Sequence, residues 1–537
     1  MTAALIEQEA TAPGTPAREG DGGGCGVSGL DGLSYEERVR LAAPWPVRWL
    51  EPWVEGEPKR MVELFGGPGG MGKGRDLLGV PVDCVAVEKN EGAAATARAA
   101  GHQVIVADIR TLDPMHPALA YTHWVHGSPP CGTLSKGGKL TGIRPDDVMH
   151  VADVIGHMGE VFGFLQVDDV CSLYGGPHDW AGEVIEGMED HPDADKGGPD
   201  CWGGILPPNG TTPDELRAWA LEGVSDERTA LMIEPVMWVL ALQSIGAPVE
   251  GMTMEQSDNL LRKAPRICEE IQAELWGAGW QQCVFQIEDA ADFGAPTHRV
   301  RTYAMATRND APLGYSYDVD RRDRPEFKEA REDGGWLEIG HYVDLYRGRT
   351  PLPTVTLAQA MDWAPGHIVD TRGQRRIDPK TGRVKGGGSF PADRVGQCVT
   401  ATWYGATLRA TGERAFTQSD LGMIVGFPRD HPWRHVGKRE GIRTRAQQAA
   451  DAVCPLIGAG IAGAVLGADW YQPAKTYHAQ LYRLDREDQQ PPVTERPALN
   501  AAPLRAELPP AALPVPQAAV EVWHPLAAAP AELIAWH

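Results

Sequence analysis

Short apolar runs recur early in the chain, and each is followed by a polar or glycine-rich segment. The runs at 61–65, 84–87, 104–107 and 124–127 have the length of strands, and an Ala-rich, helix-length segment, 92–100, separates the second from the third. Strands that alternate with helix-length segments are typical of parallel β-α-β units. The pattern therefore predicts an α/β fold with a doubly wound, Rossmann-like sheet.

The two ends of the chain differ from this pattern. Residues 1–58 include three consecutive glycines, and residues 471–537 include 11 prolines. Because such segments need not pack, we expect a flexible N-terminal arm over 1–58 and a Pro/Ala-rich tail over 471–537. An uncharged, mostly apolar stretch, 452–468, falls short of the roughly 20 residues that span a bilayer. We interpret it as a buried helix and expect no contact with a membrane.

Composition narrows the class of protein. The 537 residues are 42% hydrophobic and 23% charged, which is typical of globular proteins. A net charge of −23 argues against a protein that coats nucleic acid through bulk positive charge, although a local basic patch is compatible with it. The nine cysteines form no C-x-x-C pair and residues 1–7 do not resemble a secretory signal, so we expect a reducing, cytoplasmic location.

The charge is distributed unevenly. Residues 139–225 carry a net charge of −13, and we interpret them as a solvent-facing acidic insertion. The insertion contains two cysteines and two histidines, namely Cys171, His178, His191 and Cys201. Because their spacing is loose, we predict no metal site. Residues 346–415 carry a net charge of +6 and are the candidate contact for a polyanion.

Three consecutive strand ends carry candidate ligand-binding groups. The first predicted strand ends in a glycine-rich turn at 66–72, the second ends in Glu88 and the third in Asp108. Glycines let the backbone approach a ligand, while carboxylates can accept ribose hydroxyls or an adenine amino group. The turn is not a P-loop, because Gly74 follows Lys73, and it fits the dinucleotide fingerprint less well. We therefore predict a site for an adenosine-based methyl donor.

A candidate nucleophile follows the next strand. Residues 128–135 read SPPCGTLS, so two prolines precede Cys131 and restrict the backbone there. A cysteine on a rigid loop at a strand end, beside a cofactor pocket, is a candidate for nucleophilic catalysis.

These motifs, with five further ones, resemble the cytosine-5 DNA methyltransferase family, of bacterial or phage type. The first two matches are the turn LFGGPGG at 64–70 and the Pro-Pro-Cys loop. The others follow in the family's order: DERTAL at 226–231, TMEQ at 253–256, FGAPTHRVR at 293–301, LGMIVGFP at 421–428 and QAADAVCP at 448–455. The resemblance covers residues 60–138, 226–310 and 416–470.

The resemblance implies a domain plan and a cofactor. It implies a catalytic, S-adenosylmethionine-binding methyltransferase domain over 59–310, a smaller target-recognition region over 311–415, and a segment over 416–470 that returns to the catalytic domain. The implied cofactor is S-adenosyl-L-methionine. The residues expected to bind it are Phe65, Gly67, Gly69, Gly70, Glu88, Asp108, Ile109, Pro130, Asp451 and Val453.

The resemblance also assigns catalytic roles. Cys131 is expected to add to cytosine C6, and Glu255 to contact ring N3 and the exocyclic amine. Arg299 and Arg301 are expected to hold the pyrimidine carbonyl and to supply positive charge that helps the thiol ionise. Glu234 is a competing candidate for the acid, but it lies in a helix pattern, so we prefer Glu255.

The sequence departs from the family's pattern at several positions. Gln256 replaces Asn beside Glu255, Thr297 replaces Gln, and Gly132 replaces the Gln that usually follows the cysteine. Ala450 and Asp451 replace a Gly-Asn pair, which affects how the last helix packs against the cofactor.

The expected partner is double-stranded DNA, from which the target cytosine is flipped out. The basic residues Arg372, Arg375, Arg376, Lys380, Arg383 and Lys385, followed by the Thr-x-Thr stretch 400–402, are candidates for DNA contact. Two alternatives stay open: the same chemistry on RNA, and a catalytically dead regulator that binds S-adenosylmethionine or DNA. We expect a monomer in a bacterial cell, host- or phage-encoded, and the family allows a separate cognate restriction endonuclease as a partner of a restriction-modification system.

Overall fold

The computed structural model describes most of the chain up to residue 484. The described ranges are 32–135, 140–164, 212–308, 349–371, 388–436 and 442–484, with short pieces at 316–318, 341–343, 345–346, 376–377 and 384–385. Contacts divide the chain into a unit of residues 1–490 and a unit of residues 491–537. All described residues belong to the first unit.

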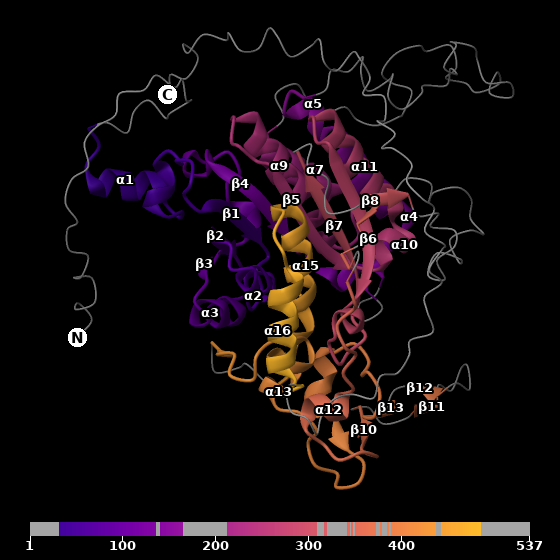
Figure 1. Cartoon of the computed structure of the whole chain (residues 1–537). Coiled ribbons are helices and arrows are strands. Elements are labelled where there is room, and N and C mark those ends of the chain that lie inside the picture. Colours follow the sequence, from indigo (N-terminus) through magenta and orange to yellow (C-terminus); the bar gives the residue numbers. More distant parts are fainter. Residues whose placement is uncertain are drawn as a thin grey trace, which may run out of the picture. The chain divides into compact units, whose positions relative to one another are not determined.

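A seven-stranded sheet organises this unit (Figure 1). Its strands are β1 (Lys59–Leu64), β2 (Val82–Val87), β3 (Gln103–Ile105), β4 (Thr122–Gly127), β5 (Gly251–Ser257), β6 (Gln282–Asp289) and β7 (Val300–Thr307). They lie in the order β3-β2-β1-β4-β5-β7-β6, and only β7 runs antiparallel to its neighbours. The predicted α/β, doubly wound, Rossmann-like fold is confirmed. The order reverses between β1 and β4, and sheets of this kind bind ligands at such a switch point.

Helices cover both faces of the sheet (Figure 1). One face carries α4 (Pro145–Gly156), α9 (Glu234–Ser244) and α11 (Pro265–Gly277), and the other carries α2 (Gly70–Leu77), α3 (Glu91–Ala99) and α15 (Pro455–Leu466). Side chains alternate along a strand, so Val62 and Leu64 of β1 enter one core cluster while Met61 enters the other. Burial on both faces explains why the strands read as continuous apolar runs.

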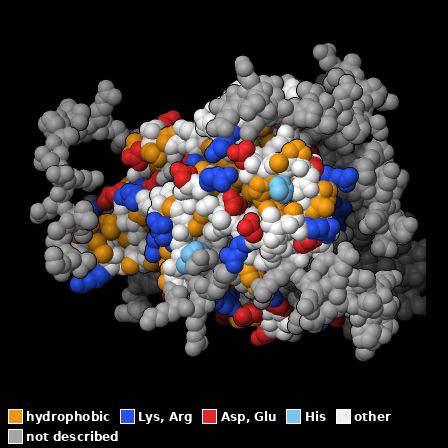
Figure 2. Space-filling model, turned by 90° about the horizontal axis from the view of Figure 1, so that it is seen from below, with side chains coloured by type: hydrophobic (Ala, Val, Ile, Leu, Met, Phe, Trp, Pro, Cys, Tyr) orange, Lys and Arg blue, Asp and Glu red, His pale blue; other side chains and the backbone are white. Residues whose placement is uncertain are grey.

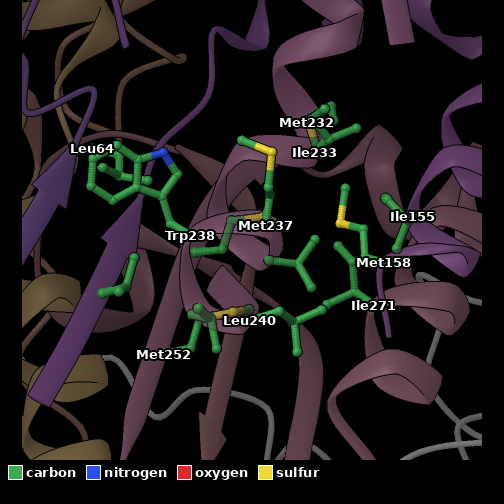
Figure 3. Close-up of a cluster of buried hydrophobic side chains, with 14 of the residues drawn as sticks. Leu64, Ile155, Met158, Met232, Ile233, Met237, Trp238, Leu240, Met252 and Ile271 are labelled. Atoms are coloured by element: carbon green, nitrogen blue, oxygen red, sulfur yellow. The ribbon is translucent and has the colours of Figure 1, made fainter. Parts of the chain in front are cut away.

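The larger core cluster lies between the sheet and α9 and α11 (Figure 3). Leu64 and Met252 project from the sheet towards Trp238 and Leu240 of α9, and Ile271 of α11 closes the cluster. All five side chains are at most 1% exposed. Each side chain of this size contributes about 1.5–3 kcal/mol when it is fully buried.

The N-terminal arm predicted over 1–58 folds from Ser34 onwards, which corrects the expectation for that part. Ser34 caps α1 (Tyr35–Ala42), and the 3-10 helix η1 (Val47–Leu50) follows. Trp49 is completely buried and donates its indole N–H to Asp83 (2.7 Å). The buried area of Trp45 and Trp49 offsets the entropy of ordering this segment.

The predicted tail over 471–537 also begins with a folded segment. Residues 471–481 form α16 (Tyr471–Leu481), and the hydroxyl of Tyr482 donates to the Met423 carbonyl (3.1 Å). The apolar stretch 452–468 forms α15 with its flanking residues, and 78% of the apolar window within Ala446–Leu466 is buried inside the protein. This agrees with a buried helix.

The acidic insertion predicted over 139–225 is narrower than expected. Its outer parts form α4, α5 (Met158–Val161) and α7 (Pro213–Glu222), and Ile155 and Leu216 are fully buried in the core. These two parts therefore belong to the main fold and are not a solvent-facing insertion. Residues 165–211 lie outside the described ranges, and so do Cys171, His178, His191 and Cys201.

The remaining short elements connect this framework. Those between β3 and β7 are η2 (Ile109–Thr111), η3 (Pro117–Leu119), η4 (Cys131–Thr133), η5 (Thr141–Ile143), α8 (Glu227–Ala230), η7 (Leu231–Ile233), α10 (Asn259–Lys263) and η8 (Ala290–Phe293). Those after β7 are β8 (Ser316–Asp318), β9 (His341–Val343), α12 (Leu357–Met361), β10 (Ile368–Asp370), β11 (Arg376–Ile377), β12 (Val384–Lys385), β13 (Ser389–Pro391), η12 (Ala401–Gly405), β14 (Thr407–Leu408), α13 (Gln418–Ile424) and α14 (Ile442–Asp451).

A small three-stranded sheet, β13-β10-β14, marks the region predicted to recognise the target. Trp363, Phe416 and Trp403 stack in its apolar core. Basic and acidic side chains are interspersed on the face seen in Figure 2. Of the candidate DNA contacts, Arg372, Arg375, Lys380 and Arg383 lie outside the described residues, and only the backbone of Arg376 and Lys385 is described.

Candidate active site

The glycine-rich turn after β1 leaves open space beside its backbone. Phe65, Gly67 and Gly69 all have positive φ values (60°, 55° and 90°), so the chain turns sharply before α2 begins. A Cβ added at Gly67 would meet nothing within 4 Å, whereas one at Gly70 would overlap the carbonyl of Val453. Gly70 is thus required for packing against the segment before α15, and Gly67 leaves room for a ligand.

Glu88, at the end of β2, is tied to this turn. Its carboxylate accepts hydrogen bonds from the backbone N–H groups of Gly67 (2.9 Å) and Asn90 (2.5 Å). Burial nevertheless raises the pKa of Glu88, and these hydrogen bonds only partly oppose the increase. Since each carboxylate oxygen can accept a second hydrogen bond, Glu88 can still bind hydroxyl groups.

Asp108, after β3, is more constrained than the sequence suggested. Its carboxylate pairs with Arg110 (2.8 Å) and Lys89 (2.7 Å), and the Arg110 side chain first, then Lys89, holds its pKa well below the usual range. The next residue, Ile109, is buried, and its carbonyl accepts a hydrogen bond from Arg217 (3.4 Å). A ligand at this strand end would therefore contact a carboxylate that is already neutralised.

The Pro-Pro-Cys loop leaves β4 at the switch point. Pro130 precedes η4, which begins at Cys131, and the Cys131 side chain is half-buried. Gln256 stands where the family's pattern has Asn. Its side-chain amide donates to the Pro129 carbonyl (3.1 Å) and so anchors the loop.

A chain of buried side chains supports the same loop. The indole N–H of Trp124 donates to Thr253 Oγ1 (3.1 Å), which bonds His126 Nδ1 (2.9 Å), and His126 Nε2 bonds Ser128 Oγ (2.8 Å). Burial lowers the pKa of His126 to about 3, so the ring is neutral. Trp124 can only donate, so Thr253 Oγ1 accepts from it and can itself donate to His126 Nδ1; in that tautomer Nε2–H donates to Ser128.

Glu255 of β5 forms a buried charged group with Arg301 of β7 and with Arg299, the residue before β7. Arg301 Nε lies 3.1 Å and Arg299 Nη2 lies 3.7 Å from Glu255 Oε1. Glu255 and Arg299 are at most 3% exposed. Among the described residues, Glu255 Oε1 and the Nε atoms of both arginines have no hydrogen-bond partner. Glu255 Oε1 and Arg301 Nε therefore contact each other only as an ion pair, and the group keeps hydrogen-bonding capacity that a ligand could use.

The two arginines have different surroundings. Arg299 donates to the Ala450 carbonyl (2.6 Å) at the end of α14, whereas Arg301 Nη2 lies 4.0 Å from Cys398 Sγ. Thr297 holds the segment that carries Cys398, by donating to the Gln397 carbonyl (2.7 Å). Arg301 therefore faces the segment that carries Cys398, and Arg299 connects Glu255 to the end of α14.

Burial raises the pKa of the Cys131 thiol. Arg301 and Arg299 act against the increase, but Glu255 and Asp451 add to it. The expectation that two arginines make the surroundings of the thiol positive is therefore incomplete, because two acids share the site. The same interactions place Cys131 within electrostatic range of all three residues that were predicted to act with it.

Asp451 and Val453 complete the group of predicted cofactor residues. Asp451 ends α14, is exposed to solvent and accepts a hydrogen bond from the Gln447 amide (2.6 Å). Its charge acts on Glu88 as well as on Cys131. Val453 is buried against Gly70 of the turn.

Glu234, the competing acid, is occupied elsewhere. It forms a buried ion pair with Arg217 (2.9 Å) and accepts the indole N–H of Trp238 (3.0 Å) inside the larger core. This supports the choice of Glu255. Sequence reasoning did not select His126, Cys398 or Arg228, whose guanidinium would contact a Cβ at Gly132. Only the fold identifies them, because Arg228 acts electrostatically on Cys131, His126 bonds Ser128 of the same loop, and Cys398 approaches Arg301. Among the described residues, no group of three His, Cys, Asp or Glu side chains could hold a metal ion.

Comparisons with known proteins return structures only. No protein-family profile and no curated protein matches the chain. Solved structures similar to it include a mutant DNMT2 of Spodoptera frugiperda (12% identity, TM-score 0.35, 76% of this chain and 99% of that chain). The Dnmt2 methyltransferase of S. pombe (12%, 0.38, 76% and 98%) and a putative DNA modification methyltransferase encoded within an E. coli prophage (12%, 0.36, 76% and 99%) are also similar. At these values they carry no functional argument, so the function is inferred from this chain's own residues.

Proposed function

We propose that this protein is a DNA (cytosine-5-)-methyltransferase. The observation that carries the proposal is the convergence of Cys131 with the buried ion-paired group of Glu255, Arg299 and Arg301, at the point of the sheet where the Gly-rich turn also lies. A nucleophile, an acid and fixed cations in one place suit an addition to an electron-poor ring.

The residues of the turn fit S-adenosyl-L-methionine as the cofactor. Gly67 leaves open space, and Glu88 has acceptor capacity for ribose hydroxyls at the adjacent strand end. Asp108 and Ile109 lie at the third strand end, where an adenine would be held. When bound, the cofactor would supply a methyl group on a positively charged sulfur.

The chemistry then follows from the residues around Cys131. The thiolate adds to C6 of cytosine, and the electron pair of the C5–C6 bond becomes available at C5 to take the methyl group. Glu255 holds ring N3 and the exocyclic amine, while Arg301 neutralises charge that develops as sulfur adds. Loss of the C5 proton to water and departure of the thiolate restore the C5–C6 double bond.

The rigid loop contributes by fixing the nucleophile. Gln256 holds Pro129, and the chain of His126 and Thr253 holds Ser128, so two of the three residues before Cys131 are attached to the sheet. A nucleophile fixed in position avoids the entropy of orienting it for each reaction. The buried location of the site requires the target base to leave the duplex, at a cost of a few kcal/mol.

The proposal is tested by sequencing modified cytosines in a bacterial host that lacks DNA methylation. Expression of the protein should give methylated cytosine within one short DNA sequence, and a Cys131→Ser variant should give none. Total RNA from the same cells is examined in parallel. Methylation confined to RNA would replace DNA by RNA as the substrate, and modification that persists in the variant would contradict the role of Cys131.

A further inference from the structure

Asp451 places a negative charge in the candidate site at a position where the family's pattern has a neutral amide. Its Oδ1 accepts the Gln447 amide (2.6 Å), and among the described residues no hydrogen bond ties Oδ2. The side chain is exposed to solvent. Asp451 is thus held in place by its own helix but keeps one oxygen available.

The backbone on either side of Asp451 joins both halves of the site. The preceding carbonyl, of Ala450, accepts the hydrogen bond from Arg299, which is paired with Glu255. Two residues later, the Val453 carbonyl lies against Gly70 of the glycine-rich turn. Asp451 therefore lies between the residues that would hold the cytosine and the turn that would hold the cofactor.

The electrostatic interactions of the carboxylate agree with this position. Its charge acts on Glu88, expected at the ribose, and on Cys131, expected at the cytosine. In a methyl transfer the donor sulfur must lie between the ribose and the ring that receives the methyl group. A carboxylate whose charge acts on both of these groups would also act on a positive charge that lies between them.

We propose that Asp451 makes the cofactor site prefer the positively charged methyl donor over the uncharged thioether product. This inference rests on the proposed function. S-adenosylmethionine and S-adenosylhomocysteine share adenine, ribose and amino-acid groups, and differ by one methyl group and one positive charge at sulfur. A negative charge near the sulfur therefore attracts the donor and not the product, which reduces product inhibition.

The test is a comparison of two dissociation constants by titration calorimetry. The full-length protein is titrated with S-adenosylmethionine and separately with S-adenosylhomocysteine, as wild type, Asp451→Asn and Asp451→Glu. The Asn variant should bind the donor about three- to tenfold more weakly and the product nearly unchanged, whereas the Glu variant should retain the preference. Asp146→Asn, at an exposed acid of α4, is the matched control for loss of one surface charge.

The outcomes separate the inference from the function on which it rests. An unchanged ratio of the two constants in Asp451→Asn, with both ligands still bound, would overturn the role of Asp451 alone. Failure of the wild type to bind either ligand would overturn the proposed function as well. If the Asn variant does not fold, the wild-type ratio at 50 and 500 mM salt decides, because a charge-based preference must narrow as salt screens it. A salt-independent ratio would contradict the inference.

Discussion

Replacement of Arg301 by Met tests the electrostatics around the nucleophile. Arg301 lies 3.1 Å from Glu255 and is the first group that opposes the burial-driven increase in the pKa of Cys131. A unit charge pair at this distance is worth about 5 kcal/mol at an effective dielectric constant of 20. Removing one partner of such a buried pair costs about 3–5 kcal/mol, so the variant should melt earlier while Arg299 still pairs with Glu255.

The thiol itself gives the sharper measurement. Loss of Arg301 removes a positive charge that stabilises the Cys131 thiolate, so the thiolate fraction should fall about tenfold at a given pH. A tenfold change corresponds to about 1.4 kcal/mol. Glu255→Gln should act in the opposite direction, since Glu255 raises the pKa of this thiol. Both variants should lose methyl transfer.

The assay is iodoacetamide labelling of Cys131 between pH 6 and 9, followed by peptide mass spectrometry. The buried Cys268 peptide monitors unfolding in the same sample. The expected order of labelling rates is Glu255→Gln fastest, wild type intermediate and Arg301→Met slowest. Equal rates in folded samples of all three proteins would refute the electrostatic reasoning.

Three further changes have defined outcomes. Gly70→Ala should weaken S-adenosylmethionine binding at least tenfold in calorimetry, because its Cβ would overlap the Val453 carbonyl. His126→Leu would leave the buried hydroxyls of Thr253 and Ser128 without a partner, at a cost of about 1–3 kcal/mol, and would release the loop before Cys131. The variant should therefore have a lower kcat and an unchanged cofactor affinity. A change confined to the melting temperature would contradict this role. Burial raises the pKa of Glu274 to about 8, so the stability that its neutral form provides is complete below the unfolded value of about 4.5 and is lost as the pH rises towards 8. Glu274→Gln should therefore raise the melting temperature at pH 8 and not at pH 5, and an equal shift at both values would refute the burial argument.

The sequence predicted the parts of the site that depend on strand ends. The turn after β1, Glu88 after β2 and Cys131 after β4 share one edge of the sheet because parallel strands end on the same side. Glu255 could be chosen over Glu234 because a helix pattern and a strand pattern differ in period.

Other features depend on contacts between distant segments, which a single sequence does not contain. Asp108 reads as a free carboxylate until Lys89 and Arg110 are seen to neutralise it. The sequence around Trp49 indicated a flexible arm, and only the fold shows that its side chain is buried in the core. The acids that oppose the arginines around Cys131 are likewise contributed by separate elements, so the direction of the pKa shift required the fold.

Covalent capture of the target base on Cys131 tests the proposed methyl transfer directly. The protein is incubated with S-adenosylmethionine and mixed-sequence DNA duplexes in which 5-fluorocytosine replaces cytosine, and the cross-linked peptide is identified by mass spectrometry. Fluorine at C5 cannot leave as a cation, so the adduct should accumulate after methyl transfer with its bond at Cys131 Sγ. Capture at another residue would contradict the role of Cys131. If protein that binds S-adenosylmethionine captures 5-fluorocytosine in RNA but not in DNA, the proposed DNA substrate would be wrong.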